Sequence, residues 1–74
     1  MTYKQRITAH PDLMLGKPVI KGTRITVELI LRKFSEGMTI EDLLNAYPHV
    51  SREDILAALS YSADVIAGEE MIAP

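Results

Sequence analysis

Three successive apolar stripes of helical period, each preceded by a capping residue and followed by a breaker, most constrain the fold of this chain. Side chains at positions i, i+3, i+4 and i+7 lie on one side of a helix and can share a core. The first stripe consists of Val27, Ile30, Leu31 and Phe34. Thr26 stands at the N-cap position, and Gly37 stands where a left-handed C-terminal cap belongs. The pattern predicts a first helix over about residues 27–36.

The second stripe is shorter and is bounded by a capping pair and a proline. It consists of Ile40, Leu43, Leu44 and Tyr47. Thr39 precedes it and Asp42 follows three residues later, which is a variant of the capping box. Pro48 cannot continue a helix and biases the residue before it away from helical backbone. We therefore expect a second helix over roughly residues 40–46.

The third stripe predicts the longest helix. Ser51 opens it, and Glu53 and Asp54 in the first turn suit the positive end of a helix dipole. The stripe consists of Ile55, Ala58, Leu59, Ser62 and Ile66, and Gly68 ends it. Small side chains on this helix would let another helix approach closely; they are Ala57, Ala58, Ser60, Ser62 and Ala63.

The residues before the first helix follow a different pattern. Residues 3–8 alternate weakly between apolar and polar side chains, and residues 10–18 are rich in turn formers. Residues 19–20 and 23–27 are predicted to form two short β pieces around the turn at Lys21 and Gly22. The predicted fold is mostly α, with a short N-terminal β element followed by a three-helix, helix-turn-helix bundle. The chain is expected to be a single domain over 1–74, comprising the β element (1–25), the bundle (26–67) and a tail (68–74).

A chain of 74 residues can bury only a thin core, and no cysteine is present to reinforce it. Efficient helix packing or self-association must compensate, so we expect a homodimer. No apolar run approaches the ~20 residues that a membrane span needs, and the N-terminus lacks the apolar segment of a signal peptide. We expect a cytoplasmic protein with no membrane partner.

The side chains that most often carry catalysis or metal binding are scarce. His10 and His49 are the two histidines, and each lies in a loop marked by proline. A nucleophile with an oriented base, or three converging metal ligands, cannot be assembled from them by any recognisable spacing. The acidic pairs at 41–42 and 53–54 begin helices, where capping accounts for them. We expect no catalytic residue, no metal site, no cofactor and no enzymatic activity.

The segment GKPVIKGTRITV, residues 16–27, looks at first like a phosphate-binding loop. A Walker loop requires a hydroxyl residue directly after the lysine, but Lys17 is followed by Pro18, which offers neither a hydroxyl nor an N–H. A β-branched segment, rather than a helix, follows Gly22 and Thr23. The nucleotide-loop interpretation is therefore rejected in favour of a strand, a turn and a second strand.

Charge is divided unevenly along the chain. Residues 1–37 hold seven basic and three acidic side chains, whereas residues 38–74 hold one basic and seven acidic side chains. Such a split suggests two faces with different partners, or two solvated faces that pair with each other in a dimer. A helix-turn-helix would place the start of the third helix in the major groove, where Arg52 could contact guanine. Glu53 and Asp54 would oppose phosphates there, so the better candidate DNA contacts are Lys17, Lys21, Arg24, Arg32 and Lys33.

Several short motifs together resemble a known family. They are I-T-x-x-P at 7–11, G-K-P-x-I-x-G-T-R-I at 16–25, E-G-M-T at 36–39, Y-P at 47–48, S-R-E-D-I at 51–55 and A-A-L-x-Y at 57–61. Over about residues 6–66 the chain resembles the domain-of-unknown-function family four-three-three of bacteria and archaea. One departure is Thr26, where many members carry proline. The resemblance implies a homeodomain-like trihelical fold behind a small β element.

The resemblance also implies a function, because members of this family look like antitoxins encoded beside a small toxin with a PIN-like nuclease domain. We expect the acidic half of the chain to face such a toxin through Glu41, Asp42, Asp64, Glu69, Glu70, Met71 and Ile72. The basic half would then bind operator DNA. The alternative is a protein-interaction or oligomerisation domain with no DNA role.

Overall fold

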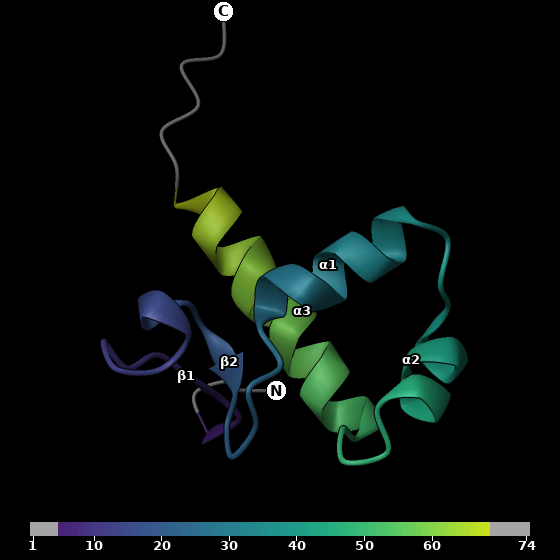
Figure 1. The fold of residues 1–74 in the computed structure, drawn as a ribbon. Helices are drawn as coiled ribbons and strands as arrows, with labels where there is room; N and C mark the ends of the chain where they lie inside the picture. Colours follow the sequence, from purple (N-terminus) through teal and green to yellow (C-terminus); the bar gives the residue numbers. More distant parts are fainter. Residues whose placement is uncertain (1–4, 69–74) are drawn as a thin grey trace, which may run out of the picture.

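The computed structural model describes residues 5–68 and confirms the mostly helical fold with a short β element (Figure 1). Its elements, in chain order, are β1 (Ile7–Thr8), the 3₁₀ turn η2 (Met14–Gly16), β2 (Val19–Ile20), α1 (Val27–Ser35), α2 (Ile40–Ala46) and α3 (Arg52–Ala67). No helix within this described range is both long and apolar enough to cross a membrane.

The helix boundaries follow the caps that the sequence predicts. The Thr26 hydroxyl accepts a hydrogen bond from the Leu29 amide at 3.0 Å. Full capping boxes start α2, at Thr39 and Asp42, and α3, at Ser51 and Asp54. In these boxes the serine or threonine hydroxyl accepts a hydrogen bond from the aspartate amide, and the aspartate carboxylate accepts one from the serine or threonine amide. Two amides at the start of each helix are therefore hydrogen-bonded.

The end of α1 is a glycine cap. Gly37 has a φ of +96°, which is a conformation that favours glycine. The amide of Gly37 donates to the Phe34 carbonyl at 2.9 Å, and the amide of Met38 donates to the Lys33 carbonyl at 3.1 Å. These are the two hydrogen bonds of a Schellman motif, and they turn the chain from α1 towards α2.

The β element pairs within the chain, and part of its prediction is wrong. β1 and β2 are antiparallel, with Ile7 opposite Ile20 and Thr8 opposite Val19. The expected second β piece at 23–27 is reduced to a single bridge between Val19 and Thr26. Thr26 is already the N-cap of α1, so the backbone after it turns helical and cannot extend the ladder.

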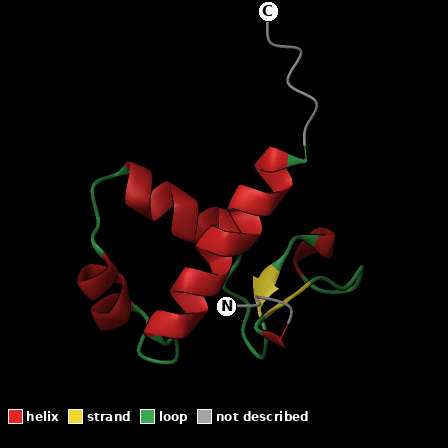
Figure 2. Cartoon of the chain, turned by 180° about the vertical axis from the view of Figure 1, so that it is seen from behind, coloured by secondary structure: helices red, strands yellow, loops and turns green. Residues whose placement is uncertain are grey.

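The core lies where α3 meets the other elements. Seen from behind, α2 and the small sheet lie on opposite sides of α3, and α1 crosses α3 between them (Figure 2). The buried cluster draws on β2, the three helices and the loop before α3, and it comprises Ile20, Val27, Ile30, Leu43, Val50, Ile55 and Ala58. The three helical stripes therefore converge on one core, as their spacing predicts.

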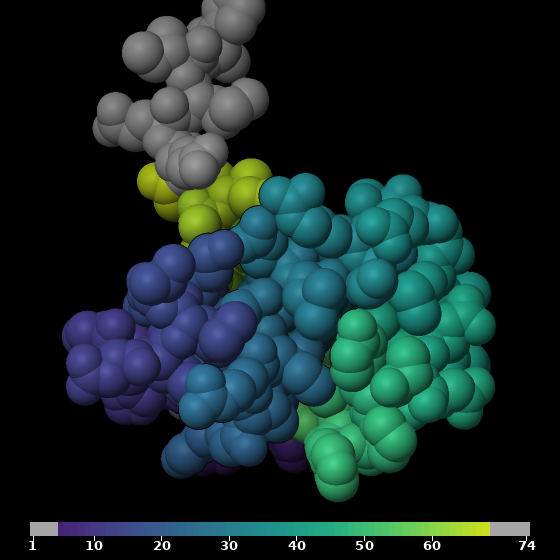
Figure 3. All heavy atoms as spheres, viewed as in Figure 1, coloured from purple at the N-terminus to yellow at the C-terminus, as the bar shows by residue number. Residues whose placement is uncertain are grey.

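The last turns of α3 depart from the predicted stripe. Ile66 is 61% exposed and Val65 47% exposed, and residues 63–67 are all exposed. This end of α3, yellow-green in Figure 3, projects beyond the body formed by α1 and the β element. The expectation that Ile66 packs in the core is wrong, because α3 continues past the elements that cover its first part.

Candidate partner and nucleic-acid interfaces

Most of the exposed large apolar side chains gather around one residue, Glu28 of α1. Six such side chains are exposed among residues 5–68, and all but Leu56 line one of two hollows that share Glu28. We call these five the apolar face: Met14, Leu15, Leu31, Val65 and Ile66. An apolar group of this kind on a small domain is the usual mark of an interaction surface.

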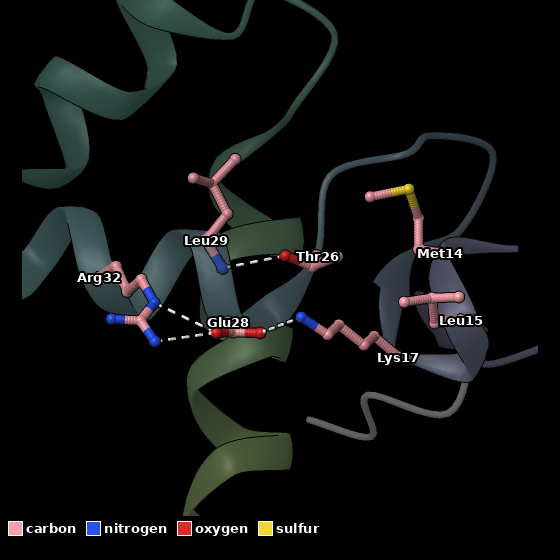
Figure 4. Close-up of a pocket in the computed structure, with 7 residues that line it drawn as sticks. All are labelled: Met14, Leu15, Lys17, Thr26, Glu28, Leu29 and Arg32. Atoms are coloured by element: carbon pink, nitrogen blue, oxygen red, sulfur yellow. Dashed lines mark hydrogen bonds and ion pairs between the residues drawn. The ribbon is translucent and has the colours of Figure 1, made fainter.

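The first hollow lies between η2 and α1 and has a volume of about 380 Å³ (Figure 4). Met14 and Leu15 stand on one side of it, and Leu29 and Arg32 of α1 on the other. Lys17 crosses between the two sides to reach Glu28. An apolar depression with charged groups at its border results.

Leu15 combines full exposure with a strained backbone. Met14 and Leu15 have φ values of +49° and +59°, in the left-handed region that L side chains rarely adopt. Such a conformation costs about 1–2 kcal/mol per residue. Leu15 is nevertheless 93% exposed, so burial within the chain does not offset that cost. Sequence reasoning missed this residue, because nothing but the neighbouring Gly16 signals positive φ here.

The second hollow lies between α1 and the projecting end of α3 and has a volume of about 280 Å³. Leu31 lines it from α1, and Tyr61, Val65 and Ile66 line it from α3. Pro18 also lines it. Because α3 continues past the elements that cover it, its last turns are exposed and also form a groove with α1.

Glu28 holds an ion-pair cluster between the two hollows. Its carboxylate accepts hydrogen bonds from Lys17 Nζ at 2.7 Å and from the Arg32 guanidinium at 3.0–3.1 Å (Figure 4). The hydrogen bond from Lys17, followed by that from Arg32, lowers the pKa of Glu28 below its ordinary value of 4.5. Lys17 and Arg32, two of the predicted DNA contacts, are thus ion-paired with a carboxylate of their own chain.

The other predicted DNA contacts divide in the same way. Lys33 pairs with Glu36 at 3.6 Å, and Arg52 pairs with Glu41. Lys21 and Arg24, in contrast, form no ion pair with any residue in the described range. The structure brings these two cations together on the turn between β2 and α1.

A third hollow of about 450 Å³ lies beside that turn. We call it the turn hollow; it is lined by Thr8, His10, Leu13, Lys21, Gly22, Thr23 and Arg24. No carboxylate is among these side chains. The Thr8 hydroxyl and His10 Nε2 lie 3.2 Å apart within hydrogen-bonding distance. Thr8 and His10 were not predicted to belong to any site, because their approach to the turn depends on the pairing of β1 with β2.

Comparison with known proteins places the chain in a family. The family model described as Protein of unknown function (DUF433) matches residues 7–62. This chain belongs to the DUF433 family. The family resemblance inferred from the motifs is therefore confirmed.

Two relatives of this DUF433 chain give the extent of the likeness. Uncharacterized protein y4eO of Sinorhizobium fredii (strain NBRC 101917 / NGR234) is 30% identical over 70 residues, which are 93% of this chain but 32% of that protein. The crystal structure of a DUF433 member protein from Anabaena variabilis ATCC 29413 superimposes with a TM-score of 0.80 at 29% identity. It covers 84% of this chain and 61% of that one. The chain thus spans about a third of the length of the curated relative that it matches.

The described residues of the predicted acidic surface lie apart from one another in the DUF433 fold, two on α2 and one on α3. Glu41 and Asp42 lie in the first turn of α2, beside the start of α3, where Glu41 pairs with Arg52. Asp64 lies exposed near the other end of α3. The remaining four, Glu69, Glu70, Met71 and Ile72, lie outside the described residues. Of the described members of the set, Asp64 directly precedes Val65 of the apolar face in the sequence.

The start of α3, where a helix-turn-helix protein would contact bases, carries acidic charge. Glu53 is exposed there, Asp54 caps the helix, and Arg52 is paired with Glu41. Residues 5–68 also contain no group of three His, Cys, Asp or Glu side chains that could hold a metal ion. The interfaces that this part of the DUF433 chain offers are the apolar face and the turn hollow.

Proposed function

We propose that this DUF433 chain is a non-catalytic, antitoxin-type module that binds and neutralises a partner protein through the apolar face. The observation that carries the proposal is the grouping around the Glu28 cluster of five of the six large apolar side chains that are exposed among residues 5–68. The strained, exposed Leu15 supports it, because local strain tends to be kept where it serves binding.

The partner that fits best is a small PIN-like nuclease toxin, as the family resemblance implies. Its RNA-handling surface is expected to be basic, and the exposed carboxylate of Asp64 at the border of the apolar face would complement it. Apolar anchors at the centre of an interface with charges at its rim are the usual arrangement of stable protein complexes.

Co-expression with the product of the neighbouring gene tests this proposal. The two chains are expected to co-purify, and the DUF433 chain is expected to restore growth that the toxin arrests. Leu15→Asp and Ile66→Asp should each weaken the complex by about 2 kcal/mol, roughly 30-fold in Kd, as loss of an interface hot spot does. Leu56→Asp is the matched control, because Leu56 is 40% exposed and lies on α3 away from both hollows.

A wild-type chain that neither co-purifies with the neighbouring product nor restores growth would refute the antitoxin assignment. If Leu56→Asp weakened the complex as much as Leu15→Asp, the partner would bind elsewhere on the chain. Self-association through the apolar face is the alternative, that of an oligomerisation domain. In that case light scattering would detect a homodimer that Ile66→Asp converts to a monomer.

A second proposed function is binding to operator DNA, and it rests on Lys21 and Arg24, the two cations that form no ion pair within residues 5–68. Contacts to phosphates would come from this turn rather than from the start of α3, whose exposed Glu53 repels them. Affinity for a duplex of the upstream region should fall steeply with salt. Absence of binding at low salt would remove this function and leave the partner-binding function untouched.

A further inference from the structure

The turn between β2 and α1 concentrates groups that lack a partner within the described chain. Five of the seven basic side chains among residues 5–68 pair with a carboxylate, and the two that do not, Lys21 and Arg24, are three positions apart. The backbone amides of Gly22 and Arg24 also find no acceptor within that range. Four hydrogen-bond donors, two of them charged, therefore meet at one turn.

The turn is held in shape before any ligand arrives. The amide and the hydroxyl of Thr23 both donate to the Ile20 carbonyl, at 3.0 and 2.8 Å, while the hydroxyl accepts the Ile25 amide at 3.0 Å. Gly22 takes a φ of +81°, and a Cβ built on it would meet nothing within 4 Å. Glycine is needed there for the backbone conformation, and the space beside it stays open. Little conformational entropy is lost when such a turn binds a ligand.

The opposite wall of the turn hollow adds neutral polar groups. Thr8 and His10 come from β1 and the segment after it, which β-pairing brings beside the turn. The hydroxyl and the imidazole lie 3.2 Å apart, and whichever of the two accepts in this contact keeps a hydrogen that it can donate to a ligand. Because no carboxylate lines the hollow, its electrostatic preference is for an anion.

We propose that the turn hollow binds one phosphate group of a nucleic-acid backbone, with Lys21 and Arg24 as the cationic contacts and the pair of Thr8 and His10 as the source of one additional donor. This inference rests on the proposed DNA-binding function and identifies its contact site. A phosphodiester presents several acceptor oxygens and one negative charge, which match the unpaired donors. No Phe, Tyr or Trp side chain lines the hollow to stack a base, so the contact positions the duplex rather than selecting its sequence.

Fluorescence anisotropy with a labelled duplex, measured at increasing salt concentration, tests the assignment. The double variant with Lys21→Ala and Arg24→Ala should reduce the slope of log affinity against log salt by about one, and each single variant should reduce it by less. His10→Ala should weaken binding about tenfold, as loss of one hydrogen bond to a charged group does. Lys17→Ala is the control of equal charge change, because Lys17 is engaged by Glu28 and lines a different hollow.

The outcomes separate the site from the function. If the wild-type chain binds the duplex but Lys21→Ala and Lys17→Ala reduce the slope equally, the turn hollow is refuted while DNA binding stands. If no duplex is bound at low salt, the DNA function fails and this inference fails with it. An NMR titration with inorganic phosphate completes the test. Shifts of the Gly22 and Thr23 amides with phosphate, without duplex binding, would assign the hollow to a free phosphate and overturn the nucleic-acid assignment.

Discussion

At the scale of single residues, Asp54 joins three parts of the fold. One carboxylate oxygen accepts the Ser51 amide at 3.0 Å, the other accepts Arg6 Nη1 at 3.0 Å, and the Asp54 amide donates to the Ser51 hydroxyl. The side chain is 14% exposed. Arg6 directly precedes β1, so this carboxylate caps α3 and also fastens the β element to it. Asp42, the equivalent aspartate of α2, has only the capping role.

We predict that Asp54→Ala lowers the free energy of unfolding by about 2 kcal/mol, because a capping contact and a partly buried ion pair are both lost. Asp42→Ala, which removes an exposed capping contact from α2, should cost about 1 kcal/mol or less. Urea unfolding of the two variants beside the wild type measures the difference. Equal losses would show that the contact with Arg6 contributes nothing to stability.

Glu28 predicts how part of the stability depends on pH. Its pKa is lowered in the folded chain, chiefly by Lys17 and then by Arg32, so its carboxylate stabilises the fold at pH values above the ordinary 4.5. That contribution is lost as the pH falls through the lower, folded-state pKa. The stability difference between wild type and Glu28→Gln should therefore shrink below pH 4.5 and stay constant at neutral pH. In a Lys17→Met background, the stability difference that Glu28→Gln makes should be smaller. A difference that grows as the pH falls would contradict a lowered pKa of Glu28.

At the scale of elements, local signals account for the helices. Thr26, Thr39 and Ser51 were identifiable as caps because each needs only its own side chain and the next three amides. The Gly37 cap is local in the same sense. Features that depend on distant segments were not accessible from the sequence. The predicted strand at 23–27 is reduced to a bridge because α1 begins after its N-cap Thr26, and the turn hollow depends on the pairing of β1 with β2.

The candidate sites were predictable to a lesser extent than the fold, for a related reason. The sequence indicated which side chains are basic, but not which of them pair with a carboxylate elsewhere, as Lys17 does with Glu28 across eleven positions. Likewise, the helical period predicted that Ile66 lies in the core, but Ile66 is exposed. The period of a stripe cannot show where the elements that cover it end. Exposure and pairing are properties of the assembled fold.

A substitution in the turn η2 should affect the stability of the chain and its binding to a partner in opposite directions. Leu15 has a φ of +59° and is almost fully exposed, so glycine at this position would relieve strain and lose almost no packing within the chain. The strain energy relieved in the folded chain is slightly larger than the stabilisation that glycine's added conformational entropy gives the unfolded chain. Leu15→Gly should therefore raise the free energy of unfolding by about 0.5 kcal/mol. The same variant should bind the partner protein less tightly. Thermal unfolding measures the first effect, and a clear loss of stability would show that Leu15 packs against the chain.

At the scale of the whole molecule, the chain holds a small core where α3 meets the other elements and leaves its apolar face exposed. A domain of this size has little stability to spare, and an apolar surface left in water adds none. The length of α3 beyond its covering elements fits this arrangement, since the projecting turns contribute to a groove with α1 rather than to the core. A partner that covers the face therefore adds burial that the chain alone does not have.

We predict that binding the partner protein strongly stabilises the chain. At a free partner concentration of about 100 times Kd, mass action contributes about 2.7 kcal/mol, which corresponds to a rise in Tm of about 10 °C or more for a domain of this size. Differential scanning fluorimetry with and without the partner measures it. The double variant with Leu15→Asp and Ile66→Asp should keep the Tm of the free wild-type chain and lose the rise, because both side chains lie outside the buried core. A large fall in Tm of that free variant would instead make the apolar face part of the fold, and a full rise with the partner would place the interface elsewhere.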